Sequence, residues 1–316
     1  MRLRGDETLA VLAGGPSCER EISLLSGRAV WKALTGRGFR AFLLDPMDGF
    51  LSVLKKENVR AAFLALHGAF GEDGTVQRLL EGEGIPYTGP GVEASERAFD
   101  KVRAQRLFGE RGILVPPHFV LRKDGPLPRS GEGSFSLPWV VKPARGGSSM
   151  GVSIASDEEG YREACRKAFS YSDVLLVEKY IEGRELTVGI LGDEALPVVE
   201  IVPKREFYDT EAKYQDSGTV YKVPAPLEPF QAEKLQETAL GAYRALGCEA
   251  VSRVDILLGP SGDFYVLEVN TLPGLTEKSL LPKAAWAAGI DFPELCVRII
   301  ELSLGRIRGD CLMQKS

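Results

Sequence analysis

Two apolar segments near the C-terminal end of the chain flank a cluster of turn-forming residues. The stretch from Val251 to Gly274 carries β-branched and apolar residues on both sides of Gly259-Pro260-Ser261-Gly262-Asp263. Such a pattern predicts two antiparallel strands joined by a tight turn. With the turn centred between Ser261 and Gly262, one strand face holds three cross-strand pairs, namely Asp255 with Glu268, Arg253 with Asn270 and Leu257 with Val266. The opposite face is apolar and is expected to pack on a core, and it holds Val254, Ile256, Leu258, Tyr265, Leu267 and Val269.

The polar face of this hairpin places two acidic side chains opposite each other. Carboxylates directly across a ladder lie about 5 Å apart and repel each other unless a cation lies between them. Mg²⁺ would remove that repulsion, because Asp, Glu and Asn oxygens are its preferred ligands. A solvated acidic face is the other interpretation, and a register slip of one residue would exchange the two faces. The hairpin alone leaves both interpretations open.

The first hundred residues repeat an apolar strand, a turn and a helix. Strands are predicted over 8–15, 40–44 and 61–66, and the first is followed by a helix to Gly36 or Gly38 with Ser17 as its N-cap. This alternation predicts a doubly wound parallel α/β domain, in which ligands bind at the carboxyl ends of the strands. Glu19 follows the first strand, and His67 and Glu72 follow the third. The Gly14-Gly15 turn lacks the dinucleotide spacing, and His67 could equally be a turn residue.

A glycine-rich segment follows a predicted strand in the middle of the chain. A charged helix over 95–110 contains Lys101, and the strand 137–142 ends at Lys142 before the loop 143–152, PARGGSSMGV. Glycines let backbone amides converge on an anion, and a lysine beside them adds a positive charge. The loop is not a Walker P-loop, and a flexible connection is the other interpretation. We place a domain boundary close to residue 97.

The second half of the chain adds strands, a polar segment and two helices. The strand 173–181 ends near Glu178-Lys179, which could receive an adenine or form an exposed pair. The polar segment 204–220 has the character of a lid. Amphipathic helices are predicted over 227–246 and 293–304, and 309–316 is expected to be a flexible tail.

Composition and charge narrow the class of protein. The chain has 316 residues, 44% of them hydrophobic and 26% charged, which is typical of a soluble protein with two or three domains. A net charge of −5 argues against non-specific nucleic-acid binding, and no apolar run approaches the ~20 residues of a membrane span. Five scattered cysteines without a CxxC spacing indicate neither disulfides nor zinc. We expect a cytoplasmic protein.

Taken in order, several motifs of this chain resemble those of the D-alanine–D-alanine ligases of the ATP-grasp superfamily. They are GGPSCEREIS (14–23), LHGAFGEDG (66–74), YTGPGVEAS (87–95), the Asp100-Lys101 pair, VKPARGGSSMGV (141–152), VEKYIEGRELTV (177–188), FYDTEAKY (207–214), SRVDI (252–256) and LEVNTLPGLTEKSLLP (267–282). The resemblance covers nearly the whole chain. It implies an N-terminal α/β domain, residues 1–97, followed by a two-domain ATP-grasp fold with subdomains 98–184 and 185–308.

The resemblance also implies a role for each matched position. Lys101, Lys142 and the loop Ser148, Ser149 and Gly151 would contact the phosphates of ATP, while Glu178, Lys179 and Ile181 would receive the adenine and Glu185 the ribose. Asp255, Glu268 and Asn270 would ligate two Mg²⁺ ions, for which Mn²⁺ is a possible substitute. Glu19 would meet the first D-alanine and link through Ser148 to Tyr214. The remaining substrate groups would be His67, Lys213, Ser279 and Leu280, with Arg253 and Gly274 at the oxyanion.

These assignments imply a cytoplasmic, homodimeric ligase that makes D-alanyl-D-alanine for peptidoglycan through an acyl phosphate. Its partners would be D-alanine and ATP, with no nucleic acid and no membrane. Two alternatives stay open, a ligase for a different acid or nucleophile such as D-lactate, and a nucleotide-binding protein without catalysis. Met150 and Lys278 depart from the motifs of some relatives, and Lys278 adds a positive charge near the second-substrate site.

Overall fold

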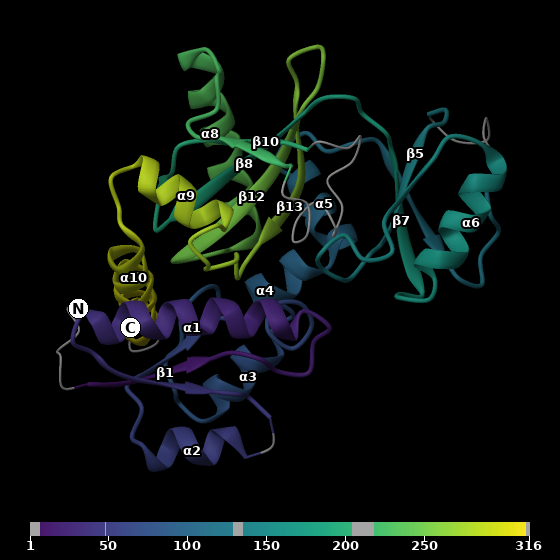
Figure 1. The fold of residues 1–316 in the computed structure, drawn as a ribbon. Coiled ribbons are helices and arrows are strands. Elements are labelled where there is room, and N and C mark those ends of the chain that lie inside the picture. The colour runs from purple at the N-terminus through teal and green to yellow at the C-terminus, as the bar shows by residue number, and fades with distance from the viewer. Residues whose placement is uncertain (1–6, 48, 129–134, 204–217, 314–316) are drawn as a thin grey trace.

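The computed structural model describes residues 7–47, 49–128, 135–203 and 218–313. Within these ranges the strands form three sheets, one parallel and two antiparallel (Figure 1). This arrangement confirms the expected mixture of an α/β unit with α+β units. None of the helices in the same ranges is long and apolar enough to cross a membrane.

The N-terminal sheet has the order β2-β1-β3, with all pairs parallel. Its strands are β1 (Thr8–Leu12), β2 (Arg40–Leu44) and β3 (Ala61–Leu64), and its helices are α1 (Arg20–Gly36), α2 (Phe50–Lys56) and α3 (Thr75–Gly82). Because side chains alternate along a strand, Leu9 and Val11 pack with α1, while Ala10 and Leu12 pack with α2 and α3. Helices on both faces give the doubly wound arrangement that the alternating pattern predicts.

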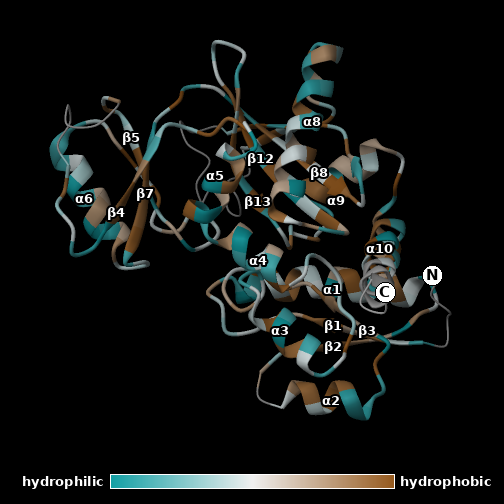
Figure 2. Cartoon of the chain, turned by 180° about the vertical axis from the view of Figure 1, so that it is seen from behind, coloured by the Kyte–Doolittle hydropathy of each residue, from teal (hydrophilic) through white to brown (hydrophobic). Residues whose placement is uncertain are grey.

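The second sheet has the order β4-β7-β5-β6 and is antiparallel. It consists of β4 (His118–Arg122), β5 (Trp139–Pro143), β6 (Ser153–Ala155) and β7 (Val174–Lys179), and α6 (Glu158–Ala168) covers one face. Trp139 and Tyr161 meet edge to face with their ring centroids 4.9 Å apart. In Figure 2 the outward side of α6 is hydrophilic, whereas strands such as β7 are largely hydrophobic.

The third sheet has the order β11-β10-β8-β12-β13, with β9 paired to β8. Its strands are β8 (Arg184–Leu191), β9 (Glu194–Ala195), β10 (Val199–Val202), β11 (Val220–Lys222), β12 (Val251–Leu258) and β13 (Phe264–Asn270). Helix α8 (Pro229–Leu246) packs on the face that carries Val254 and Ile256. Helices α9 (Leu280–Ala287) and α10 (Phe292–Met313) complete the unit, and α10 also packs against α1.

Three expectations about helix ends are wrong. The helix predicted over 95–110 is two helices, α4 (Val92–Phe99) and α5 (Lys101–Gly109), because Asp100 is extended and its side chain accepts a hydrogen bond from the N–H of Arg103. Ser17 is not the N-cap of α1, since that helix begins after Glu19. Helix α10 continues to Met313, past the expected end at residue 304 and into the expected tail.

The hairpin has the predicted pairs Arg253 with Asn270 and Asp255 with Glu268, but not the third. A β-bulge between Asp255 and Ile256 shifts the register, so that Ile256 pairs with Val266 and Leu257 with Tyr265. One extra residue in a strand exchanges the faces beyond it. Val266 and Phe264 therefore point into the core, and Tyr265 and Leu267, expected on the core face, are only partly buried.

The division into segments 1–97, 98–184 and 185–308 stays our proposal. Each segment contains essentially one of the three sheets. Helices α4 and α5, however, pack with the core of the third sheet rather than the second.

Candidate active site

One cleft of about 650 Å³ is lined by the second and third sheets and by the loops that follow the N-terminal strands. Most residues that the sequence analysis selects line this cleft. They are Glu19, His67, Lys101, Lys142, Ser148, Ser149, Glu178, Lys179, Ile181, Glu185, Arg253, Asp255, Glu268, Asn270, Gly274, Ser279 and Leu280. Gly151 is not one of the lining residues, and a Cβ there would meet Pro143 Cγ at 2.9 Å. Lys213 and Tyr214 lie outside the described residues.

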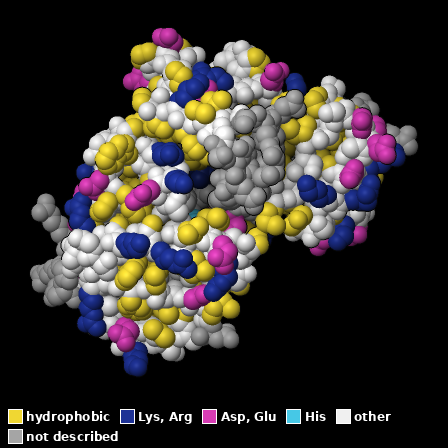
Figure 3. Space-filling model, in the orientation of Figure 1, with side chains coloured by type: hydrophobic (Ala, Val, Ile, Leu, Met, Phe, Trp, Pro, Cys, Tyr) yellow, Lys and Arg dark blue, Asp and Glu magenta, His cyan; other side chains and the backbone are white. Residues whose placement is uncertain are grey.

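Charged side chains are interspersed on the face of the molecule shown in Figure 3. Lys and Arg lie among Asp and Glu there, and the described residues of that face form no single basic surface. Most of the charged residues that the sequence analysis selects instead line the cleft.

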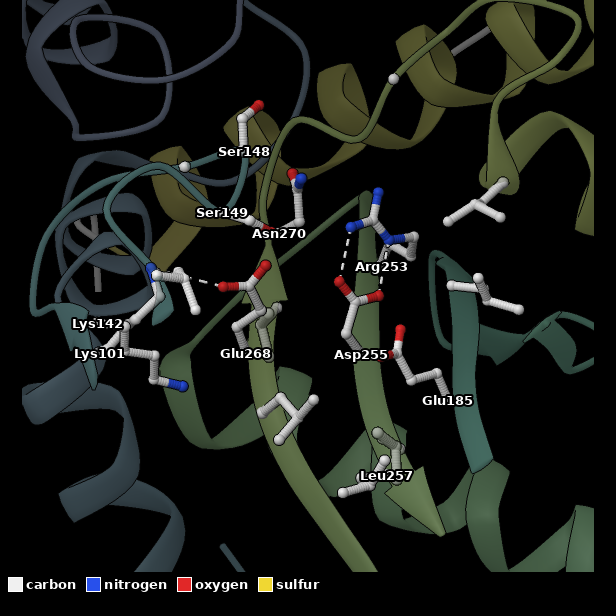
Figure 4. Close-up of a pocket in the computed structure, with 18 of the residues that line it drawn as sticks. Lys101, Lys142, Ser148, Ser149, Glu185, Arg253, Asp255, Leu257, Glu268 and Asn270 are labelled. Atoms are coloured by element: carbon white, nitrogen blue, oxygen red, sulfur yellow. Dashed lines mark hydrogen bonds and ion pairs between the residues drawn. The ribbon is translucent and has the colours of Figure 1, made fainter. Parts of the chain in front are cut away.

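The polar face of the β12–β13 hairpin forms one wall of the cleft (Figure 4). Arg253 makes a bidentate pair with Asp255, donating from Nε to Oδ1 at 2.8 Å and from an Nη to Oδ2 at 2.7 Å. The Thr187 hydroxyl lies 2.6 Å from the same Oδ1. Across the ladder, Lys101 Nζ lies 3.5 Å from Glu268 Oε2. Two protein cations therefore already relieve the carboxylate repulsion that the sequence predicts.

The same wall carries the oxygen donors that a metal ion would need. Asp255 and Glu268 are paired carboxylates, and Asn270 follows on the same strand face as Glu268. No group of three or more His, Cys, Asp or Glu side chains that could hold a metal occurs in the described ranges. The predicted set is of a different kind, since it contains two carboxylates and one amide. Mg²⁺ is commonly held by one or two carboxylates together with substrate phosphates and water. The residues present therefore fit magnesium better than zinc, which favours Cys and His.

Two lysines face the hairpin from the opposite side of the cleft (Figure 4). Lys142 at the end of β5 pairs with Glu178 on β7 at 2.8 Å, and both side chains are almost fully buried. Lys101, the first residue of α5, donates to the carbonyl of Gly146 at 2.6 Å. The helix break at Asp100 makes Lys101 the first residue of a new helix, which begins beside the glycine-rich loop. The lysine side chain can therefore contact that loop.

The glycine-rich loop folds back on itself between β5 and β6. Ser148 and Ser149 have φ of 50° and 56°, a left-handed conformation that is uncommon for residues with a side chain. The Ser148 hydroxyl donates a short hydrogen bond to Glu19 of the N-terminal unit. A Cβ at Gly147 would lie 2.7 Å from Glu19 Oε2, so a larger residue there would displace this carboxylate. The loop is thus linked to the N-terminal unit through the carboxylate of Glu19.

Behind Glu19, the loop after β3 contributes a buried His-Glu pair. His67 Nδ1 lies 3.1 Å from the carbonyl oxygen of Leu272, which can only accept, so Nδ1 carries a proton. Its Nε2 lies 3.1 Å from the Ser26 hydroxyl. Burial raises the pKa of Glu72 above its ordinary value, and the negative charges of Glu19 and Glu268 act in the same direction. The proximity of His67, whose Nδ1 lies 3.8 Å from Glu72 Oε1, opposes this rise.

The loop before α9 forms the remaining wall. Ser279 precedes α9 as its N-cap residue, and its hydroxyl lies 3.1 Å from the N–H of Thr276. Gly274 approaches closely, since a Cβ there would lie 2.9 Å from Ser279 Oγ. Lys278 also lines the cleft next to these residues. This wall offers hydroxyl and cationic groups suited to a carboxylate.

The end of the cleft near Glu178 has an apolar lining that the sequence analysis missed in part. Val140, Ile181, Leu257 and Leu267 line it, and the β-bulge brings Leu267 to this face. A flat apolar space with polar groups at its rim suits a nucleobase. Two further residues were missed, Thr187 and Gln105, which contact Asp255 and Glu178. The only sequence signal for Gln105 is its spacing of one helical turn from Lys101.

Comparison with known proteins agrees with this geometry. The chain matches the family model described as D-ala D-ala ligase C-terminus over residues 107–301, and the model described as D-ala D-ala ligase N-terminus over residues 46–90. The chain belongs to the D-alanine–D-alanine ligase family. It is therefore an enzyme of the ligase class, with the ATP-grasp fold that the sequence motifs imply.

Members of this family with similar sequences cover nearly the whole chain. The D-alanine–D-alanine ligase of Citrifermentans bemidjiense is 49% identical over 294 residues, which is 93% of this chain and 95% of the relative. That of Geobacter sulfurreducens is 46% identical over 303 residues, 96% of each.

Two crystal structures of the Bacillus anthracis enzyme have the same fold. One matches with a TM-score of 0.87 and 36% identity. The other, described as complexed with ATP, matches with a TM-score of 0.85 and 34% identity. Each comparison covers 96% of this chain and 99% of the other.

Proposed function

We propose that this ligase joins two molecules of D-alanine into D-alanyl-D-alanine for peptidoglycan synthesis, with ATP as the energy source. The observation that carries the proposal is that one cleft brings together two lysines, the glycine-rich loop, Glu19 and the polar hairpin face. A carboxylate is a poor electrophile, so ATP must first convert it to an acyl phosphate. The amine of the second D-alanine then attacks, and phosphate leaves through a tetrahedral oxyanion.

The nucleotide lies between the second and third sheets in this proposal. Lys142 and Lys101 contact the phosphates, and the backbone of Ser148, Ser149 and Gly151 covers them. Glu178, Lys179 and Ile181 receive the adenine, and Glu185 holds the ribose. The support is the apolar lining beside Glu178 and the position of both lysines across the cleft from the hairpin.

Asp255, Glu268 and Asn270 would hold two Mg²⁺ ions, or Mn²⁺ in their place. When bound, these ions supply positive charge that neutralises the phosphoryl group during transfer. The donor set supports this assignment, because it combines two paired carboxylates and an amide on one strand face. Asp255 is held in place by Arg253 and Thr187 whether or not an ion is present.

The amino-acid substrates lie toward the N-terminal unit. Glu19 binds the ammonium of the first D-alanine, and His67 lies beside it. Ser279 and Leu280 bind the carboxylate of the second, and Arg253 with the Gly274 N–H meets the oxyanion. Such donors stabilise charge that develops only in the transition state. The link between Ser148 and Glu19 supports this placement, because it joins the phosphate loop to the first-substrate site.

The test is to incubate the protein with D-alanine, ATP and Mg²⁺ and to measure dipeptide and ADP. We expect one dipeptide per ADP, and no ester when D-lactate replaces the second amino acid. Glu268→Gln should lower turnover by at least about 10-fold, because losing a metal ligand costs no less than losing a group that orients one. The exposed Glu110→Gln serves as the matched control and should leave turnover unchanged. ADP release with another acid, but none with D-alanine, would overturn the proposal.

We also propose that the enzyme is a cytoplasmic homodimer. The support for the location is the predicted use of ATP, and the dimer follows from the resemblance to the family. Light scattering on a size-exclusion column measures the mass directly, and a mass of 34.4 kDa would contradict the dimer.

A further inference from the structure

A buried amide on α5 contacts the carboxylate that we assign to the adenine. Gln105 is 1% exposed, and its Nε2 donates a short hydrogen bond to Oε1 of Glu178. Gln105 lies four residues after Lys101, which places both side chains on one face of the helix. One helix therefore reaches the phosphate end of the cleft through Lys101 and the base end through Gln105.

The orientation of this amide follows from its charged neighbour. If the amide were turned over, its oxygen would meet the carboxylate of Glu178 and repel it, so Nε2 must face Glu178. The Gln105 oxygen has no hydrogen-bond partner among the described residues. A buried polar atom without a partner is unfavourable, and an apolar residue would avoid it. The hydrogen bond that Nε2 donates to Glu178 therefore explains why an amide occupies this position.

Glu178 Oε1 receives a second donor from the other side. Lys142 Nζ lies 2.8 Å from the same oxygen. Two donors on one oxygen fix the rotation of the carboxylate. The other oxygen is then left to accept from a group in the cleft, which Glu178 lines.

We infer that Gln105 is a positioning residue that holds the Glu178 carboxylate in a fixed orientation and so selects adenine over guanine. The inference rests on the proposed function, in which Glu178 receives the base. Adenine presents an amino donor at the position where guanine presents a carbonyl oxygen. A fixed carboxylate accepts a hydrogen bond from the first and repels the second, whereas a carboxylate that can rotate discriminates less.

The test compares Gln105→Met with Gln77→Met. Gln77 is also a fully buried amide whose oxygen has no partner in the part of the chain that the structure describes, but its Nε2 donates to the Gly71 carbonyl at 2.7 Å, in the N-terminal unit. Both variants lose one buried hydrogen bond. We expect Gln105→Met to raise KM for ATP about tenfold with kcat nearly unchanged, and to lower the ATP-to-GTP ratio of kcat/KM by a similar factor. Gln77→Met should change neither the KM for ATP nor this ratio.

Gln105→Asn provides a second variant if the methionine protein does not fold. It keeps the amide but is one methylene too short to reach Glu178, and it should give the same rise in KM. Circular dichroism and thermal melting verify that each variant is folded. A structural role alone would lower the melting temperature without changing the ATP-to-GTP ratio.

Glu178→Gln separates failure of this inference from failure of the proposed function. It should raise KM for ATP, and adding Gln105→Met to it should have little further effect, because both act through one carboxylate. If Glu178→Gln leaves KM for ATP unchanged, the adenine assignment fails. If Glu178→Gln raises KM but Gln105→Met behaves like Gln77→Met, the adenine assignment stands and the role of Gln105 is refuted.

Discussion

The Thr187 hydroxyl holds one oxygen of Asp255, and replacing it with a methyl group tests the proposed metal site. Thr187 is 1% exposed, and its hydroxyl lies 2.6 Å from Asp255 Oδ1 and 3.1 Å from the carbonyl oxygen of Val254. A hydroxyl has one proton to donate. We assign this proton to Asp255 Oδ1, because the contact is shorter and a carboxylate oxygen is the stronger acceptor. Thr187→Val keeps the shape of the side chain and removes only this donor.

The structure sets the expected size of the effect. Asp255 keeps its two hydrogen bonds from Arg253, so the carboxylate is not left unpaired. We expect stability to fall by about 1.5–3 kcal/mol, the range for one hydrogen bond to a charged group. Losing a group that orients a metal ligand typically weakens metal affinity 10- to 100-fold. The Mg²⁺ concentration for half-maximal activity should therefore rise by this factor, with kcat at saturating Mg²⁺ largely retained.

The assay is ADP release as a function of Mg²⁺ concentration at fixed ATP and D-alanine. Thr187→Ser keeps the hydroxyl and should restore the wild-type Mg²⁺ requirement. Mn²⁺ binding measured by electron paramagnetic resonance gives a reading that does not depend on turnover. An unchanged Mg²⁺ requirement in Thr187→Val, together with a lower melting temperature, would show that the hydroxyl is only structural and does not orient a metal ligand.

Three further predictions follow from the same contacts. Gly147→Ala would place a Cβ 2.7 Å from Glu19 Oε2. This variant should raise KM for D-alanine about tenfold, which corresponds to a loss of roughly 1.4 kcal/mol of binding free energy. A wild-type KM would refute the proposed contact between Glu19 and D-alanine. Removing divalent cations with EDTA should abolish ADP release but leave the melting temperature nearly unchanged. The reason is that Arg253 and Lys101 already neutralise the carboxylates of Asp255 and Glu268. A large drop in melting temperature would contradict this expectation. The hydrogen bond from Arg184 lowers the pKa of Glu200, burial opposes it, and Lys222 reinforces it. The stability from Glu200 is therefore present above its ordinary pKa of about 4.3 and is lost as the pH falls through the lower native pKa. Thermal melting should show Glu200→Gln as less destabilising at pH 3 than at pH 7, and an equal difference at both values would refute it.

Features that depend on neighbouring positions could be predicted from the sequence. The alternation of strand and helix predicts the N-terminal parallel sheet, since each apolar period reports the face that a segment buries. The pairs Arg253 with Asn270 and Asp255 with Glu268 follow from the position of the hairpin turn. The ordered motifs predict the family and most of the residues that line the cleft.

Features that depend on contacts between distant segments required the tertiary structure. The β-bulge that turns Leu267 toward the cleft leaves the apolar pattern of β13 unchanged, so the sequence could not reveal it. The helix break at Asp100 places Lys101 where it contacts the carbonyl of Gly146, 45 residues further along the chain. Gln105 and Thr187 contact their carboxylates across 73 and 68 residues. Local periodicity fixes which face of a segment is buried, but only packing decides which polar groups meet there, because a hydrogen bond depends on positions within tenths of an ångström.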